Sequence, residues 1–318
     1  FENNTVGVSH TNAVSITENV TNTIIKGNTF LGSTRDYSVS LGNGSTGTLL
    51  AGNTISGSPN GVAITSSGNF VYYNNISGFL NDGITLDRQS NFNLIGLNLV
   101  DSAGLAQGRA SGSGIFLNSE SNHNVVFNNR FTGSFENGVA LFRVSNNLIW
   151  GNQVTGNGQG GIFLNDNDGT ILVSTGRAPR ENVVTENYSH DNLSNGNVQG
   201  VRTVNNEVSR NYLSVAQGSN PDGKTGIRWE DSSGNTSTHN TLGNLGAGFF
   251  LQPTSTANAF YRNRLLGVFS NHVQSPATAA LDAGPVLGGN FYSDNTNTAV
   301  GNPTTGAIYS RFIYTNSN

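Results

Sequence analysis

Short apolar runs separated by glycine, asparagine and serine recur along the whole chain. Many have a Gly-aliphatic-x-aliphatic form, as in GITL at 83–86, GIFL at 114–117 and GVAL at 138–141. About ten or twelve residues later comes a second apolar run that ends in asparagine, such as LIWGN ending at Asn152. Apolar residues alternate with small polar or aromatic ones, which indicates short strands with one buried face. The undisturbed spacing of 22 to 24 residues predicts a repeat of two or three strands joined by tight turns.

This repeat predicts an all-β coil in which each turn of parallel strands stacks on the turn before. The asparagine at a fixed place in each repeat is then expected to hydrogen-bond its counterparts above and below, which satisfies turn backbone in the interior. Eleven candidate positions run from Asn28 to Asn290. At about 4.8 Å per turn, the coil is expected to be on the order of 50 Å long.

The pattern G-I-x-L followed by S-x-N-N-x-I-x-x-N resembles the right-handed parallel β-helix repeat of pectate-lyase-like enzymes. It is also similar to the repeats of periplasmic copper-accessory β-helix proteins, whose closing segment resembles LGGNFYSDN at 287–295. The resemblance implies one right-handed solenoid of about 11 rungs over residues 1–318. We expect regular rungs over 1–100, rungs with groove-forming loops over 101–251, and C-terminal rungs with a cap over 252–318. This fold hosts enzymes, adhesins and structural rods, so it does not specify function.

Composition narrows the classes of function. The chain has no cysteine, which excludes disulfides and thiol catalysis and suits an exported bacterial protein that is secreted, periplasmic or on the cell surface. The net charge of −4 gives no basic footprint for nucleic acid, and no apolar window is long enough for a transmembrane segment. Five dispersed histidines without methionine or cysteine disfavour soft copper. We expect a monomer or a homotrimer, as a processed form or a fragment.

Four insertions interrupt the repeat around one column of strands. Three precede the strands that begin near 114, 200 and 226, and the fourth, NDNDGTILVSTGRAPR, follows the strand at 161–164. Because loops on both edges of a sheet form walls, we expect a groove over this sheet.

The outward positions of this column should form the floor of the groove. Alternation places aromatic rings and arginines there, and rings stack on sugars while guanidinium groups pair with carboxylate or sulfate. This combination favours an acidic polysaccharide, although a Phe stripe also stabilises a bare sheet. The expected outward row is Ser40, Ala63, Thr85, Phe116, Ala140, Phe163, Arg202, Arg228 and Phe250, and the expected substrate-binding residues are Phe116, Phe163, Phe250, Arg143, Lys224 and Tyr188.

Carboxylates near the same loops are the candidates for chemistry. Asp166 and Asp168 are predicted to bind calcium, to act as acids, or to close an ordinary Asx turn. Two rungs separate Asp166 from Glu230 and Asp231, a spacing on the order of 10 Å that glycoside hydrolysis by inversion uses. In a lyase, Arg202 or Arg228 is expected to neutralise the substrate carboxylate, and His190, Tyr188, Lys224 or an arginine to be the base.

Two functions therefore remain open from the sequence. The first is a secreted carbohydrate-active protein that binds and cleaves an acidic polysaccharide in the groove, as a uronate lyase or a glycoside hydrolase. The second is a non-catalytic structural or glycan-binding module of a larger cell-surface protein.

Overall fold

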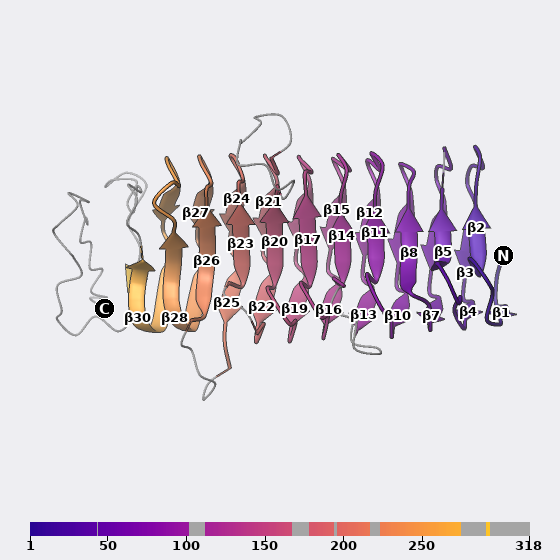
Figure 1. The fold of residues 1–318 in the computed structure, drawn as a ribbon, viewed down its shortest axis with the longest axis horizontal. Helices are drawn as coiled ribbons and strands as arrows, with labels where there is room; N and C mark the ends of the chain where they lie inside the picture. The colour runs from indigo at the N-terminus through magenta and orange to yellow at the C-terminus, as the bar shows by residue number, and fades with distance from the viewer. Residues whose placement is uncertain are drawn as a thin grey trace, which may run out of the picture.

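A computed structural model of the chain describes residues 1–42, 44–101, 112–166, 178–193, 196–216, 223–274 and 291–292. Its strands form one elongated coil, with β1 (Thr5–Val6) near one end and β30 (Arg264–Gln274) near the other (Figure 1). Every strand pairing within the described ranges is parallel, and each strand pairs with its counterparts in the turns below and above. These ranges contain no helix with the length and apolar character needed to span a bilayer. The predicted all-β parallel right-handed coil is confirmed.

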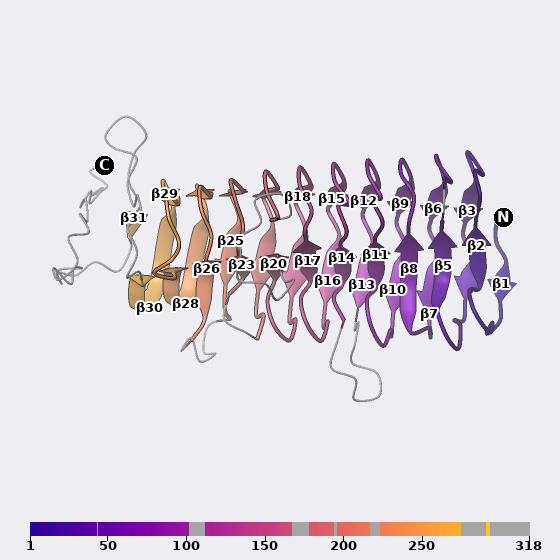
Figure 2. The same cartoon turned by 45° about the horizontal axis from the view of Figure 1, so that its top comes forward.

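Each complete turn of the coil passes through three columns of strands, which Figure 2 shows one above another. The first column contains β2 (Val14–Ile16), β5 (Tyr37–Leu41), β8 (Asn60–Ile64), β11 (Ile84–Leu86), β14 (Ile115–Leu117), β17 (Val139–Phe142), β20 (Ile162–Asn165), β23 (Val198–Val201), β26 (Thr225–Glu230) and the later parts of β28 (Thr241–Leu251) and β30 (Arg264–Gln274).

The second column forms a separate sheet of ten strands. It contains β3 (Ile24–Lys26), β6 (Leu49–Ala51), β9 (Phe70–Tyr72), β12 (Leu94–Gly96), β15 (Val125–Phe127), β18 (Leu148–Trp150), β21 (Val183–Thr185), β24 (Glu207–Ser209), β27 (Thr236–Thr238) and β29 (Ala259–Tyr261).

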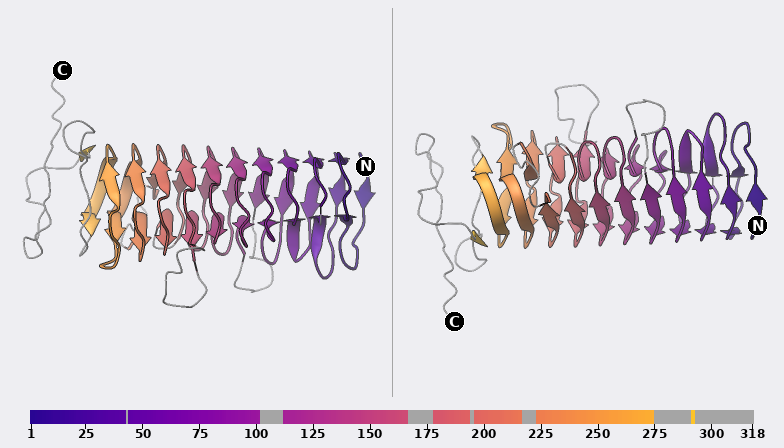
Figure 3. Two further views of the ribbon diagram at one scale, coloured as in Figure 1. Left: turned by 90° about the horizontal axis from the view of Figure 1, so that it is seen from above. Right: turned by 90° about the horizontal axis from the view of Figure 1, so that it is seen from below.

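The third column leads into the next turn of the first. It contains β1 (Thr5–Val6), β4 (Thr29–Phe30), β7 (Thr54–Ser56), β10 (Asn75–Ser77), β13 (Leu99–Asp101), β16 (Arg130–Thr132), β19 (Gln153–Thr155), β22 (Tyr188–His190), β25 (Tyr212–Ser214), the first parts of β28 and β30, and β31 (Phe291–Tyr292). The columns stay in register along the coil in both views of Figure 3.

The core is a stack of aliphatic and aromatic side chains inside the coil. In the first column two residues per strand point inward, for example Ile115 and Leu117, and both are fully buried. The second and third columns each contribute one central residue per strand, such as Ile149 and Val154, which are also fully buried. This alternation is the one that the sequence predicts, so the residues between the inward positions face outward.

Two asparagine ladders run along the coil. The predicted ladder lies between the second and third columns, and each side-chain Nδ2 donates to the Oδ1 of the next asparagine at 2.9–3.0 Å, from Asn28 to Asn263. A second ladder, from Asn69 to Asn258, precedes the second column. The ladder prediction is confirmed over this range, and Asn290 lies outside the described residues.

The strand order places the insertions as expected. Residues 102–111 and 217–222 separate a third-column strand from the next first-column strand, and the segment containing 194–195 does the same between β22 and β23. Residues 167–177 instead follow β20. Insertions therefore flank both edges of the first column, while these four ranges themselves lie outside the described residues.

Candidate functional site

The outward row of the first column differs from the predicted row at one position. Phe163 pairs in register with Gln199, and Gln199 pairs with Arg228, so Gln199 occupies the place expected for Arg202. The prediction was wrong because it took Gly200 as the glycine that begins the strand. Gly200 instead sits beneath the buried indole of Trp229, where an added Cβ would come within 2.2 Å of the ring. The row is Ala63, Thr85, Phe116, Ala140, Phe163, Gln199, Arg228 and Phe250.

Three half-buried phenylalanine rings lie together in the middle of this row. Phe142, at the end of β17, inserts between Phe116 and Phe163, with ring centroids 5.1 and 5.8 Å apart and edge-to-face angles of 70° and 77°. The outward Ala140 in the same neighbourhood is only 1% exposed. Edge-to-face packing of this kind fixes the rings as an apolar surface.

Glu230 organises the far end of the row. Its carboxylate accepts hydrogen bonds from Arg228 Nε, from Gln199 Nε2 at 3.0 Å and from Gln252 Nε2 at 2.8 Å. The Arg228 guanidinium carbon lies 4.3 Å from the centroid of the Phe250 ring. Both Glu230 oxygens are engaged, so this carboxylate orients Arg228 over Phe250.

The other carboxylate candidates lie where the chain leaves the first column. Asp166 is 2% exposed and forms an ion pair with Arg143 Nε at 3.3 Å. Arg202 and Asp231 occupy the equivalent place one and two rungs further, since Asn165, Val201 and Glu230 pair in register. The Asp231 carboxylate accepts the hydroxyl of Thr254. The expected spacing of two rungs between Asp166 and Asp231 is therefore present.

The calcium hypothesis depends on Asp166 and Asp168. Within the described ranges no three His, Cys, Asp or Glu side chains are grouped as a metal site. Asp166 is already paired with Arg143, and Asp168 lies outside the described residues. The calcium site therefore stays a prediction.

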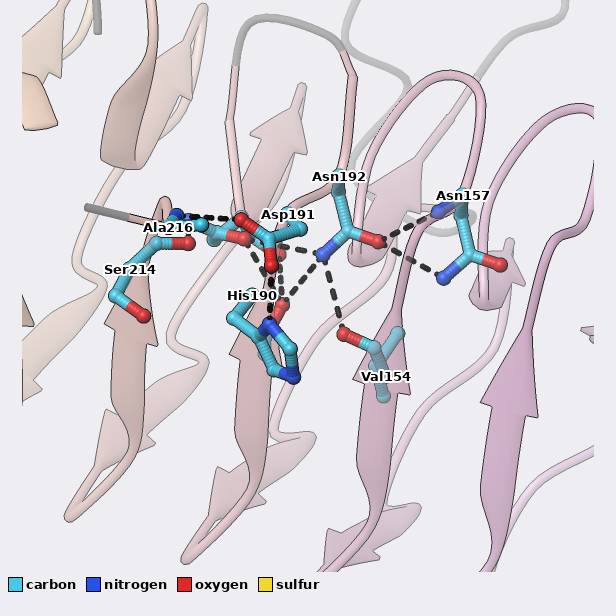
Figure 4. Close-up of polar contacts among 9 residues, drawn as sticks. Val154, Asn157, His190, Asp191, Asn192, Ser214 and Ala216 are labelled. Atoms are coloured by element: carbon cyan, nitrogen blue, oxygen red, sulfur yellow. Dashed lines mark hydrogen bonds and ion pairs between the residues drawn. The ribbon is translucent and has the colours of Figure 1, made fainter. Parts of the chain in front are cut away.

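The cluster around His190 lies in the third column, where the chain turns toward the first. Figure 4 shows His190 beside Asp191, whose Oδ2 is 2.7 Å from His190 Nδ1. Tyr188 stacks on Tyr212 with centroids 5.0 Å apart and meets the His190 ring at 4.7 Å. Asp191 also accepts the backbone N–H of Ala216. The structure therefore separates His190 from Asp166, because they lie at opposite edges of the first column.

Lys224 lies near this edge as well. Its ammonium donates to the backbone carbonyl of Leu193, and burial lowers the pKa of Lys224. A lowered pKa leaves more of the amine in the neutral form that accepts a proton, which suits the predicted role of Lys224 as a base.

A pocket that the sequence analysis did not identify opens beside the phenylalanine rings. This acidic pocket has a volume of about 120 Å³. It is lined by Asn81, Asp82, Gly112, Ser113, Phe116, Glu136, Ala140 and Phe142. Both carboxylates come from turns that enter the first column, in NDG before β11 and ENG before β17.

The protonation of these two carboxyls is perturbed. Burial, and to a smaller extent the charge of Glu136, raise the pKa of Asp82 to about 6 against the opposing effect of a 2.8 Å hydrogen bond from the Ser113 N–H to Asp82 Oδ1. Burial also raises the pKa of Glu136. Acidic residues one and two positions before the strand glycines Gly83 and Gly138, two repeats apart, are the sequence signal for this pocket. In NDG and ENG they read as ordinary turn residues.

A second, larger cavity of about 460 Å³ lies at the leaving edge. Arg88, Gln89, Ser119, Glu120 and Arg143 line it. Arg143, a predicted substrate-binding residue, is therefore at a cavity, together with a second arginine.

Comparisons with known proteins agree with this architecture. A similar solved structure is the mannuronan C-5 epimerase AlgE4 A-module of Azotobacter vinelandii, with 14% identity and a TM-score of 0.65 over 87% of this chain and 79% of that one. The Dettilon tailspike protein is 18% identical, with a TM-score of 0.60 over 91% of this chain and 61% of the tailspike chain. A double mutant of the periplasmic alginate epimerase AlgG is 20% identical, with a TM-score of 0.55 over 64% of this chain. The present chain spans only 48% of the length of AlgG in that structure.

No curated protein sequence matches the chain. The model of the right-handed β-helix region matches residues 1–143 and 112–274, which together extend over most of the sequence. The protein belongs to the right-handed β-helix family.

Proposed function

We propose that the protein binds and cleaves an acidic polysaccharide along the outward face of its first column. The observation that carries the proposal is the continuous row of half-buried rings and Arg228, held in register by the stacked strands. Flat apolar rings fit the faces of sugars, and successive rungs are about 4.8 Å apart, so several consecutive sugars fit along the row.

The arginines support an anionic ligand. Glu230 engages Arg228 through Nε alone, and a guanidinium has five N–H donors, so this contact does not exhaust its capacity to bind a carboxylate or a sulfate. Arg88 and Arg143 line the cavity at the leaving edge of the same sheet. These positive groups lie beside the row, at the edge where the strands of the first column end.

The similar solved structures support a polysaccharide as the ligand class. Two of the three are named as epimerases of alginate or mannuronan, both polymers of uronic acids. One of these is named as periplasmic, which supports action outside the cytoplasm.

The proposal is tested with a panel of alginate, pectate, a glycosaminoglycan and a neutral glucan. We expect binding of anionic members, release of reducing or unsaturated ends, and weaker binding by Arg228→Gln. The matched control is Arg210→Gln, which changes an exposed arginine paired with Glu186 beyond the second column. Absence of binding and of products across the panel contradicts the proposal.

Two further results separate the remaining alternatives. Binding without any product favours the non-catalytic glycan-binding module. Assays with a chelator and with added calcium test the predicted dependence on Asp166 and Asp168.

A further inference from the structure

The acidic pocket has the layout of a catalytic centre. Asp82 precedes β11 and Glu136 precedes β17, and β14 lies between these strands. At about 4.8 Å per rung, their backbones are about 10 Å apart. The small residues Gly112 and Ser113 of the intervening turn and the rings of Phe116 and Phe142 line the same cavity. Two carboxyl groups thus share one small cavity.

Resting on the proposed function, we propose that Asp82 and Glu136 are the general acid and the general base of a glycoside hydrolase of the inverting type. Inverting enzymes hold two carboxyl groups about 6.5–9.5 Å apart, which leaves room for the sugar and a water molecule. Asp82 and Glu136 line one cavity from turns two rungs apart, which places their backbones near the upper end of this range.

The two carboxyls differ in the way that the two roles require. Burial and the charge of Glu136 raise the pKa of Asp82 to about 6, so Asp82 keeps a proton in mildly acidic solution. The other titratable groups near this end of the site are Tyr37, Asp36 and Asp87. Burial raises the pKa of Tyr37 too, which keeps its hydroxyl neutral as a hydrogen-bond donor.

A buried hydroxyl lies beside the acidic side chains of this part of the first column. Thr85 is nine-tenths buried in the outward row, one rung before Phe116, and its Oγ1 makes no hydrogen bond of good geometry. It nevertheless lies close enough to favour the charged forms of Asp82 and Tyr37.

The reaction balances with water as the only co-reactant. Asp82 gives its proton to the glycosidic oxygen as the bond from that oxygen to the anomeric carbon breaks. Glu136 takes a proton from water, whose oxygen forms the new bond to the anomeric carbon from the opposite face. Asp82 ends as a carboxylate and Glu136 as an acid, and exchange of one proton with solvent restores both.

The pocket also limits the substrate. Asp82 and Glu136 both line it, and their two carboxyl groups would repel the carboxylate of a uronate. The sugar that is cleaved is therefore neutral, and the acidic sugars of the chain lie toward Arg228. The substrate class is a polysaccharide that contains both neutral and acidic sugars.

The test compares Asp82→Asn and Glu136→Gln with Glu207→Gln, which alters an exposed carboxylate on the second column. The probes are xanthan and hyaluronan, which mix neutral and acidic sugars, and alginate and pectate, which do not. We expect the wild type to cleave a mixed polymer. We expect kcat to fall about 10²–10⁴-fold in the two site variants, with KM within a few-fold, and to stay unchanged in Glu207→Gln.

Two measurements on the wild type do not depend on the folding of any variant. NMR of the first-formed anomer should show inversion, and kcat/KM should fall as pH rises above about 6. Cleavage that persists within threefold in either site variant, retention of configuration, or unsaturated ends overturns this inference while the proposed function stands. Failure of the wild type to bind or cleave any polymer overturns both.

Discussion

Two groups of carboxylates on the first column have opposite surroundings. Near β26, Glu230 accepts hydrogen bonds from Arg228, Gln199 and Gln252, and Asp166 is paired with Arg143. In the acidic pocket between β11 and β17, Asp82 has one backbone donor from Ser113, and no cation lines the cavity within the described residues. The first group is held by arginine and amide donors, whereas burial favours the neutral form of the second.

The difference shows which carboxylates are available for proton transfer. A carboxylate whose lone pairs are already occupied by cationic or amide donors contributes to structure, because moving a proton onto it breaks those contacts. A carboxyl group whose pKa lies near the pH of the solution, and which no cation holds in place, exchanges protons readily. We therefore assign positioning to Glu230 and chemistry to Asp82 and Glu136.

The largest stability effect is expected at Glu230. Glu230→Ala leaves Arg228, Gln199 and Gln252 without their acceptor. This contact is largely buried, because the side chains of Arg228 and Glu230 are only 22% and 15% exposed. We expect the free energy of unfolding in urea to fall by about 2–3 kcal/mol. Glu186→Ala is the control, because its ion pair with Arg210 and its hydrogen bond from Trp150 Nε1 are both exposed, and their loss should cost less than about 1 kcal/mol. An equal loss of unfolding free energy in the two variants would contradict a structural role of Glu230.

A second prediction concerns Asp82 and pH. Its folded pKa of about 6 exceeds the ordinary value of 3.8, so the folded protein binds more protons than the unfolded chain between these values. The stabilising effect of the protonated form is complete below about pH 4 and is lost as pH rises through about 6. Asp82→Asn removes this loss and should be more stable than the wild type at pH 7.

The size of that gain has an upper limit. A shift from 3.8 to about 6 corresponds to about 3 kcal/mol, and we expect less because water still reaches part of Asp82. Urea unfolding at pH 4 and pH 7 measures it. Asp166→Asn is the contrasting variant and should lose stability at pH 7, because its ion pair with the partly buried Arg143 is weakened. A destabilised Asp82→Asn at pH 7 would contradict the assignment of Asp82.

Much of the fold was predictable from the sequence because a solenoid repeats its local rules. The inward aliphatics, the asparagine ladder and the place of the insertions each follow from one repeat copied along the chain. The single error in the outward row, Arg202 for Gln199, arose where a glycine serves packing beneath Trp229 instead of beginning a strand. The sequence does not distinguish these two uses of glycine.

The candidate site was predictable only in part. Phe116, Phe163, Arg228 and Phe250 lie in the expected row, because alternation alone determines which way they face. Asp82 and Glu136 were missed because their proximity depends on small residues, Gly112 and Ser113, in a turn between them. Perturbed protonation comes from burial in three dimensions, and the turn sequences NDG and ENG contain no sign of it.

A third prediction concerns the middle of the row. Phe163→Ala removes one ring from the packed group with Phe142, so it should weaken binding of the polysaccharide with little change in kcat. Loss of one stacking contact, about 0.5–1.5 kcal/mol, corresponds to an increase in KM of roughly two- to tenfold. Phe127→Ala on the second column, where Phe127 stacks on Trp150, is the control and should leave KM unchanged. Equal effects in both would argue against the first column as the binding face.

The smallest expected effect is at Thr85. Thr85→Val keeps the shape of the side chain and removes a buried hydroxyl that has no partner of good geometry, so thermal stability should be unchanged or rise by up to about 1 kcal/mol. Thr132→Val is the matched control and should lose about 1 kcal/mol, because the Thr132 hydroxyl donates to Asp101 at 2.8 Å. A Thr85→Val protein that is clearly less stable than the wild type would show that this hydroxyl has a stabilising partner in the folded protein.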